Sequence, residues 1–251
     1  MTSTPNLLQH VRIVLCQTSH PGNIGAAARA MKTMGLSQLV LVNPKSFPHA
    51  DAIAMASGAS DILDNARVCS SLTEALSDTT LAIGMSARRR ELSHELVSAH
   101  TSVQRAIATA HQAAVAFVFG TEMSGLSNAE LDHCQLLAMI PANPEYSSLN
   151  LAAAVQIISY ELRMAALDNP QPAHSETTQP LATNEDVERL YSHLEQTLIE
   201  IGFLNPDQPK RLMQRLRRLY GRTALEQEEV NILRGILSAT QSPRPPESTN
   251  S

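Results

Sequence analysis

The sequence predicts an α/β fold, a parallel sheet flanked by helices, followed by a small all-α module. Two observations predict it. Short β-branched runs alternate with longer helical patterns through the first two thirds of the 251 residues, which is typical of a parallel sheet covered on both faces. A proline-rich polar segment then separates this part from three consecutive helical patterns. We expect a sheet domain over residues 1–167, a linker over 168–184, a helical extension over 185–240 and a disordered tail over 241–251.

Each predicted element follows from its hydrophobic pattern. Apolar runs of strand length occupy residues 11–16, 39–43, 80–86, 115–120 and 136–141. Helical periodicity, with capping residues at several ends, occupies 26–34 (ended by Gly35), 53–63, 72–78, 103–114, 128–134 and 151–167. In the extension the helical patterns run over 185–201, 207–220 and 225–240.

The composition restricts the possible partners. The chain carries a net charge of −5 and has no Trp, four Phe and four Tyr, so a nucleic-acid partner would need a local basic patch rather than an aromatic platform. Cys16, Cys69 and Cys134 lie far apart without a C-x-x-C pair, which predicts neither disulfides nor a metal site. No signal peptide and no apolar run of about 18 residues are present, so we expect a cytoplasmic protein that does not contact membranes.

Four loops that follow predicted strands are candidates for a binding site. They cover residues 17–29, 84–90, 119–131 and 140–157, and ligands of parallel sheets bind at the carboxyl ends of the strands. Gly22 and Gly25 in the first loop form G-x-x-G rather than G-x-G-x-x-G. This spacing disfavours a dinucleotide-dependent oxidoreductase, which stays an alternative that a comparison of NAD and S-adenosylmethionine binding would test.

Three of these loops carry ordered motifs: N-I-G-x-x-x-R at 23–29, F-G-x-E-x-x-G-L at 119–126, and I-P followed by S-S-L-N-L-A-x-A at 140–154. Together they resemble the motifs of the TrmH-type SPOUT RNA methyltransferases, and the likeness extends into the C-terminal module. The resemblance implies a trefoil knot in the sheet domain, a homodimer and S-adenosyl-L-methionine as cofactor. It also implies 2′-O-methylation of a ribose in the tRNA anticodon loop, at cytidine or uridine 32. A non-catalytic RNA-binding relative is the second alternative.

Carried over by motif, the resemblance implies a cofactor site of small and apolar residues. Glycine and serine let main-chain groups reach an adenine and a ribose, while Ile140 and Leu149 offer apolar contact. The implied cofactor-binding residues are Met85, Ser86, Ala87, Gly120, Ile140, Ser147, Ser148, Leu149 and Asn150.

The implied catalytic residues are Arg29, Glu122 and Asn23. A guanidinium can stabilise the charge that develops on a ribose hydroxyl, and the resemblance implies that Arg29 does so across the dimer interface. Because arginine stays protonated, the proton acceptor is left open. Glu122 would support the site or, alternatively, be a solvated loop acid, and Asn23 and Asn150 would brace the loops by hydrogen bonds to main chain. Thr121 stands where a relative has arginine.

RNA binding is predicted for two basic segments. Residues 210–222 carry six positive charges and no acid, and a helix there would place Arg211, Arg215, Arg218 and Arg222 on one stripe, suited to phosphate contacts. An adjacent stripe of Leu212, Leu216 and Leu219 would dock this helix. Arg88, Arg89 and Arg90 follow the second loop and could guide the RNA backbone. The alternative for both segments is a solvated charged surface.

Overall fold

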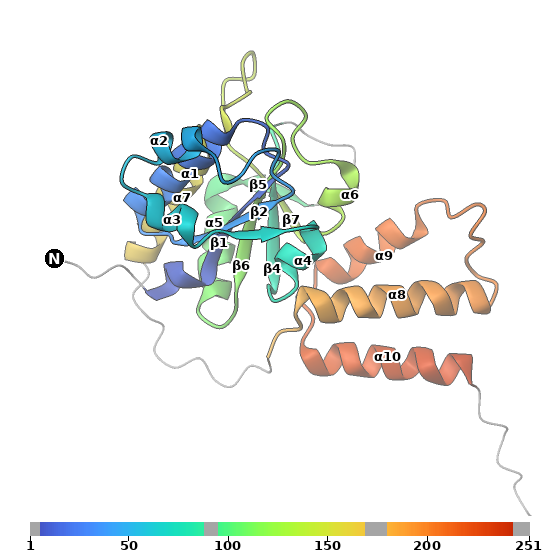
Figure 1. Cartoon of the computed structure of the whole chain (residues 1–251). Coiled ribbons are helices and arrows are strands. Elements are labelled where there is room, and N and C mark those ends of the chain that lie inside the picture. The colour runs from blue at the N-terminus through green and yellow to red at the C-terminus, as the bar shows by residue number, and fades with distance from the viewer. Residues whose placement is uncertain (1–5, 88–94, 169–179, 243–251) are drawn as a thin grey trace, which may run out of the picture. The chain divides into compact units, whose positions relative to one another are not determined.

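The computed structural model describes residues 6–87, 95–168 and 180–242 and divides the chain into two compact units, Met1–Thr178 and Gln179–Ser251 (Figure 1). The division falls inside the predicted linker over 168–184. Among the described helices, none combines the length and the apolar composition that a membrane span requires.

A seven-stranded, fully parallel sheet forms the first unit, in the order β3-β2-β1-β6-β4-β7-β5. The strands are β1 Val11–Cys16, β2 Gln38–Val42, β3 Arg67–Cys69, β4 Leu81–Met85, β5 Leu96–Ser98, β6 Val115–Phe119 and β7 Leu136–Met139. All five predicted strands are confirmed, as is the parallel pairing. β3 and β5, the two edge strands, were not predicted.

Seven α-helices and a short 3-10 helix complete the described part of this unit. Their bounds are η1 Asn6–His10, α1 Pro21–Met34, α2 Ala50–Ala56, α3 Ser60–Asp64, α4 Leu72–Leu76, α5 Ala99–Ala110, α6 Asn128–Leu131 and α7 Leu151–Asp168. The predicted helix over 26–34 begins earlier, at Pro21, and ends as expected at Gly35, whose φ is 86°. The single helix predicted within 53–63 is wrong in detail, because Ser57 and Gly58 take positive φ and divide it into α2 and α3.

The helices cover both faces of the sheet. Val11, Ile13 and Leu15 of β1 lie in a core shared with α1, α5 and α7, whereas Val14 and Cys16 lie in a second core with α4 and α6. This double burial explains why β1 is apolar at every position except Arg12, which is 9% exposed and pairs with Asp78. Because both faces are covered, the ends of the strands and the loops that follow them are the accessible parts of the sheet.

Gly25 allows α1 to pack closely on α2. A Cβ atom at this position would lie 2.0 Å from the carbonyl oxygen of Ala52, so a larger residue would separate the two helices. Gly22 has no such requirement, since a Cβ there would contact only the Met55 side chain at 3.5 Å. Of the two glycines in this loop, only Gly25 is therefore required by close backbone packing.

The order of the last strands bears on the predicted knot. β7 lies between β4 and β5, although both precede it in the sequence. The chain thus returns between two strands that it has already formed, an arrangement that simple connections avoid. The trefoil knot itself stays a prediction.

The second unit contains α8 Asn184–Glu200, α9 Leu212–Gly221 and α10 Gln227–Gln241, with α8 and α10 side by side (Figure 1). Its core is small and centres on Ala182, Leu190 and Val230. Residues 180–184, predicted as linker, belong to this unit: the Ala182 N–H donates to the Leu225 carbonyl at 2.8 Å, and the Thr183 side chain caps α8. The helix predicted over 207–220 begins only at Leu212, because Lys210 and Arg211 take positive φ.

Candidate active site

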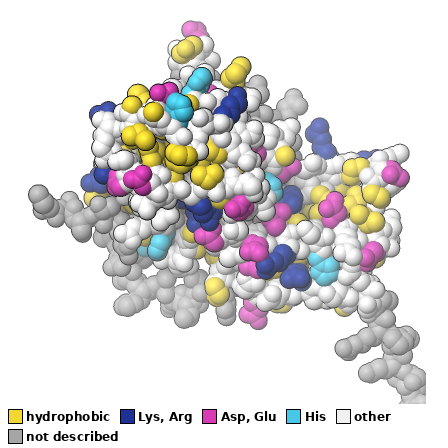
Figure 2. All heavy atoms as spheres, in the orientation of Figure 1, with side chains coloured by type: hydrophobic (Ala, Val, Ile, Leu, Met, Phe, Trp, Pro, Cys, Tyr) yellow, Lys and Arg dark blue, Asp and Glu magenta, His cyan; other side chains and the backbone are white. Residues whose placement is uncertain are grey.

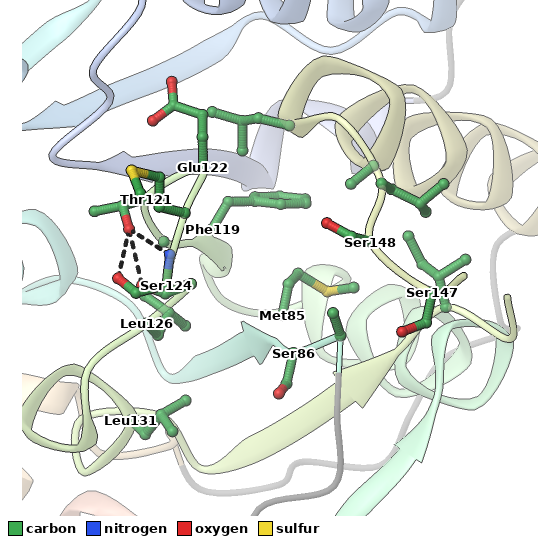
Figure 3. A pocket seen from close by; sticks show the side chains of 18 residues that line it. Met85, Ser86, Phe119, Thr121, Glu122, Ser124, Leu126, Leu131, Ser147 and Ser148 are labelled. Carbon is green, nitrogen blue, oxygen red and sulfur yellow. Dashed lines mark hydrogen bonds between the residues drawn. The ribbon is translucent and has the colours of Figure 1, made fainter. Parts of the chain in front are cut away.

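A cavity of about 290 Å³ opens at the carboxyl ends of the adjacent strands β6, β4 and β7 (Figure 3). Eight of the nine predicted cofactor-binding residues line it: Met85, Ser86, Ala87, Gly120, Ile140, Ser147, Ser148 and Leu149. Met85 and Leu149 are 64 positions apart in the chain, and the parallel topology brings them to one cavity.

The cavity has an apolar floor and a polar rim. The apolar part of the lining includes four residues that were not predicted to bind the cofactor: Phe119, Leu126, Leu131 and Leu151. The serine hydroxyls lie around these apolar groups, with the Thr121–Leu126 loop on one side and Ser147 and Ser148 on the other (Figure 3). Such a lining fits a ligand that joins a flat apolar ring to a hydroxylated sugar.

Gly120 is required by the local backbone. A Cβ atom there would lie 2.1 Å from both the carbonyl carbon of Gly125 and the nitrogen of Leu126. The loop therefore folds back directly over Gly120, and the Gly125 N–H donates to the Thr121 carbonyl at 3.0 Å. The Thr121 hydroxyl closes the same turn, since it lies 2.8 Å from the Ser124 hydroxyl and accepts from the Ser124 N–H at 3.2 Å (Figure 3).

Glu122 connects this loop to the start of α1. Its carboxylate accepts hydrogen bonds from the N–H groups of Ser19 (3.0 Å) and His20 (3.2 Å) and from the Asn23 amide (3.0 Å). Burial raises the pKa of this carboxyl, but the hydrogen bonds from Asn23, Ser19 and His20 outweigh it and lower the pKa to about 2. The carboxylate is thus ionised at neutral pH and binds free N–H groups at the helix N-terminus. It is not a solvated loop acid.

Two asparagines continue this network away from the cavity. The Asn150 amide donates to Asn23 Oδ1 at 3.1 Å, and Asn150 Oδ1 accepts from the N–H groups of Ala152 (2.9 Å) and Ala153 (3.3 Å) at the start of α7. Asn150 braces main chain as predicted, whereas Asn23 bonds to side chains instead. Asn150 does not line the cavity but a shallower neighbouring groove that Asn23 shares, so the cavity does not support its predicted contact with the cofactor.

Arg29 lies on α1 with its side chain exposed, and it is not among the residues that line the cavity of its own chain. The helix packs against both α2 and α7. These two helices expose large apolar side chains, among them Ile53 (59% exposed), Met55 (51%) and Tyr160 (50%). Apolar side chains gather on the surface of the sheet unit in Figure 2.

The predicted basic stripe is present in part. Arg211, Arg215, Arg218 and Arg222 are all exposed, but Arg211 precedes α9 and Arg222 follows it. The predicted docking stripe is wrong at Leu219, which is 48% exposed. Arg88, Arg89 and Arg90 lie outside the described residues.

Arg217 docks α9 on α8 instead. Its guanidinium pairs with both carboxylate oxygens of Glu188, at 2.5 and 2.7 Å, and lies 4.4 Å from the centre of the Tyr191 ring. The Tyr191 hydroxyl in turn donates to the Arg217 carbonyl at 3.2 Å. One of the six positive charges is therefore structural.

The described residues give little support for a metal centre or a cysteine nucleophile. No group of His, Cys, Asp and Glu side chains there is arranged to hold a metal ion. The three cysteines are free and buried. Burial is the main cause that raises the pKa of the Cys134 thiol to about 12 and that of Cys16 further, so neither provides a thiolate nucleophile at neutral pH.

Known proteins share both units. The sequence pattern of the SpoU rRNA Methylase family matches residues 10–160, and that of the tRNA methyltransferase TrmJ C-terminal domain matches residues 185–250. The tRNA (cytidine/uridine/adenosine-2′-O-)-methyltransferase TrmJ of Pseudomonas aeruginosa (strain UCBPP-PA14) is 53% identical over 247 residues, covering 94% of this chain and 95% of that protein. The tRNA (cytidine/uridine-2′-O-)-methyltransferase TrmJ of Pectobacterium atrosepticum is 52% identical, covering 94% and 98%.

A solved structure agrees with these relatives. The crystal structure of TrmJ from Z. mobilis ZM4 superposes with a TM-score of 0.80 at 31% identity, covering 92% of this chain and 98% of that one. The resemblance drawn from the three loop motifs and the helical extension is thereby confirmed. The chain belongs to the SpoU rRNA methylase family and carries a C-terminal domain of the TrmJ type.

Proposed function

We propose that this protein is an S-adenosylmethionine-dependent tRNA 2′-O-methyltransferase that modifies cytidine or uridine at position 32 of the anticodon loop, in the cytoplasm. The observation that carries the proposal is the cavity at the carboxyl ends of β4, β6 and β7. Residues of three of the four candidate loops, 84–90, 119–131 and 140–157, meet there, in a chain that matches tRNA 2′-O-methyltransferases over 94% of its length. SpoU methyltransferases bind S-adenosylmethionine.

The cavity residues fit this cofactor, which supplies an activated methyl group when bound. The turn over Gly120 exposes main-chain groups at one wall, and Ser86, Ser147 and Ser148 supply hydroxyls for the ribose and the amino-acid part. Phe119 and Leu149 supply apolar contact for the adenine. The hydroxyl, main-chain and apolar groups lie at fixed places at the ends of three adjacent strands, so the cofactor would be bound in one orientation.

Arg29 acts on the acceptor hydroxyl. A ribose 2′-hydroxyl is a very weak acid, and a nearby guanidinium stabilises the negative charge that develops on its oxygen. Arginine stays protonated, so its contribution is electrostatic and positional. The Glu122 carboxylate fixes the start of α1 and thereby the helix that carries Arg29.

The protein acts as a homodimer in this proposal. Arg29 does not line the cavity of its own chain, and exposed apolar side chains of α2 and α7 flank the helix that carries it. Such a patch is typical of an interface. With two-fold symmetry, Arg29 of one protomer would enter the cavity of the other.

The helical extension holds the tRNA. Arg211, Arg215, Arg218 and Arg222 are exposed, and none forms an ion pair with any residue in the described part of the chain. Exposed arginines near one helix suit phosphate contacts, which provide affinity and a strong dependence on salt.

The test is to map 2′-O-methylation in tRNA incubated with S-adenosylmethionine and either wild-type protein or the Arg29→Ala variant. We expect a methyl group at nucleotide 32 with the wild type and near-total loss with the variant. Arg105→Ala, which removes an exposed arginine of α5, serves as the matched control and should keep full activity. Equal activity of Arg29→Ala would remove Arg29 from its role. A wild-type protein that binds S-adenosylmethionine and tRNA without methyl transfer would identify a non-catalytic RNA-binding relative.

A further inference from the structure

Two large side chains project from the loops that form the cavity. Met123 is 98% exposed and Tyr146 is 80% exposed, which makes them the two most exposed large hydrophobic residues in the described part of the chain. Met123 belongs to the β6–α6 loop and Tyr146 to the β7–α7 loop. These loops form opposite sides of the cavity, as the positions of Thr121 and Ser147 show (Figure 3).

Hydrogen-bonded turns hold both side chains outward. The Tyr146 N–H donates to the Asn143 carbonyl at 2.9 Å, and the Glu145 N–H donates to Asn143 Oδ1 at 3.1 Å. Met123 lies at the tip of the turn that the Thr121 hydroxyl closes. The β7–α7 loop stands out from the remainder of the sheet unit in Figure 1. The local structure therefore fixes the exposure of the Tyr146 ring, at the free-energy cost of keeping apolar surface in water.

Tyr146 is placed to contact a ligand that enters the cavity only in part. Its neighbours Ser147 and Ser148 line the cavity, while Tyr146 itself does not. Two other rings of the described chain are not free to contact such a ligand at the cavity mouth. Tyr191 is buried under Arg217, and Phe119 lies 2% exposed in the cavity floor.

We propose that Tyr146 is a substrate-binding residue that stacks on the base of the nucleotide being methylated. The inference rests on the proposed function. A ribose whose 2′-hydroxyl reaches into the cavity leaves its base at the mouth, beside the aromatic ring. Every base has a π face, so stacking holds the nucleotide without reading its hydrogen-bonding edge. A stacked tyrosine thereby accounts for an enzyme that accepts cytidine and uridine alike.

The first experiment measures kcat/KM for tRNA and the dissociation constant for S-adenosylmethionine in Tyr146→Ala and Tyr146→Phe. We expect Tyr146→Ala to lower kcat/KM about tenfold, in the range that alanine substitution at stacked positions gives, with cofactor affinity unchanged. Tyr146→Phe keeps the ring and should stay within about twofold of the wild type. Val68→Ala, which shortens an exposed side chain (53%) on the far edge strand β3, is the control and should change neither quantity.

The second experiment uses a tRNA with an abasic nucleotide at the target position. Because the ring then has no base to stack on, wild-type kcat/KM should fall about tenfold and Tyr146→Ala should lower it no further. Full activity of Tyr146→Ala on normal tRNA would overturn the proposal, as would a further tenfold loss on the abasic tRNA. If the wild type transfers methyl groups to normal tRNA whichever result Tyr146→Ala gives, the proposed function stays intact. If the wild type transfers no methyl group at all, both the proposed function and the stacking proposal are refuted.

Discussion

The Glu122 carboxylate gives the sharpest prediction, through the variant Glu122→Gln. The substitution keeps the shape of the side chain but removes its charge and sets an amide against the N–H groups of Ser19 and His20. A fall in pKa from 4.5 to about 2 corresponds to about 3.4 kcal/mol at 1.36 kcal/mol per unit. The side chain is only half-buried, so solvent screening reduces this to about 1–2 kcal/mol. In a domain of this size such a loss lowers the Tm by about 2–8 °C.

The pH dependence identifies the charge as the cause. Because the folded pKa is depressed, the stabilisation is fully present above the unfolded value of 4.5 and is lost as the pH falls through about 2. Linkage gives about three quarters of it at pH 4 and about two fifths at pH 3. The Tm deficit of Glu122→Gln relative to the wild type should therefore be largest at neutral pH, smaller at pH 4 and smaller still at pH 3.

Thermal unfolding followed by circular dichroism at pH 7.5, 4 and 3 measures these deficits. Glu145→Gln, which neutralises an exposed acid of the β7–α7 loop, is the control and should unfold with the wild type. If Glu122→Gln unfolds within about 1 °C of the wild type at pH 7.5, the carboxylate does not stabilise the start of α1 as its hydrogen bonds indicate. A deficit that is the same at pH 3 as at pH 7.5 would assign the loss to packing instead.

Two further predictions concern the cavity and the extension. Gly120→Ala places a methyl group 2.1 Å from the backbone of Gly125 and Leu126, so S-adenosylmethionine should bind at least about tenfold more weakly by calorimetry; unchanged affinity would contradict the close approach. The adjacent Arg217 and Arg218 should have different roles. Arg217→Ala leaves Glu188 unpaired and should lower the Tm of the second unit. Arg218→Ala should lower the affinity for tRNA and the salt dependence of that affinity, with the Tm unchanged. The same response from both variants would remove this distinction.

Long apolar runs made most of the sheet predictable. β1 and β6 are buried at every position, so their sequences consist of apolar residues apart from Arg12, which pairs with Asp78. The edge strand β3 has only three residues, of which Arg67 and Val68 are exposed, and such a segment carries no hydrophobic pattern. The late start of α9 was missed for a related reason: the basic periodicity continues through Lys210 and Arg211, but both take positive φ.

The candidate site was predictable where motifs name its residues and not where distant partners decide. Met85, Gly120 and Ile140 come from three separate loops, and the parallel sheet places all three at one cavity. The environment of Glu122 depends on Ser19, about a hundred positions away, and no spacing rule connects the two. Likewise Arg217 has the same charge as its neighbours, and only the approach of Glu188 makes it structural.

Mixing two impaired variants tests whether Arg29 of one protomer completes the cavity of the other. Arg29→Ala keeps an intact cavity, and Gly120→Ala keeps an intact arginine. Random exchange of protomers at equal amounts makes half of the dimers mixed, and each mixed dimer has one complete site. If Arg29 acts across the interface, the mixture should recover about one quarter of wild-type methyl transfer. Activity no higher than the mean of the two separate variants would contradict it, because an arginine that acts within its own chain cannot be supplied by a partner.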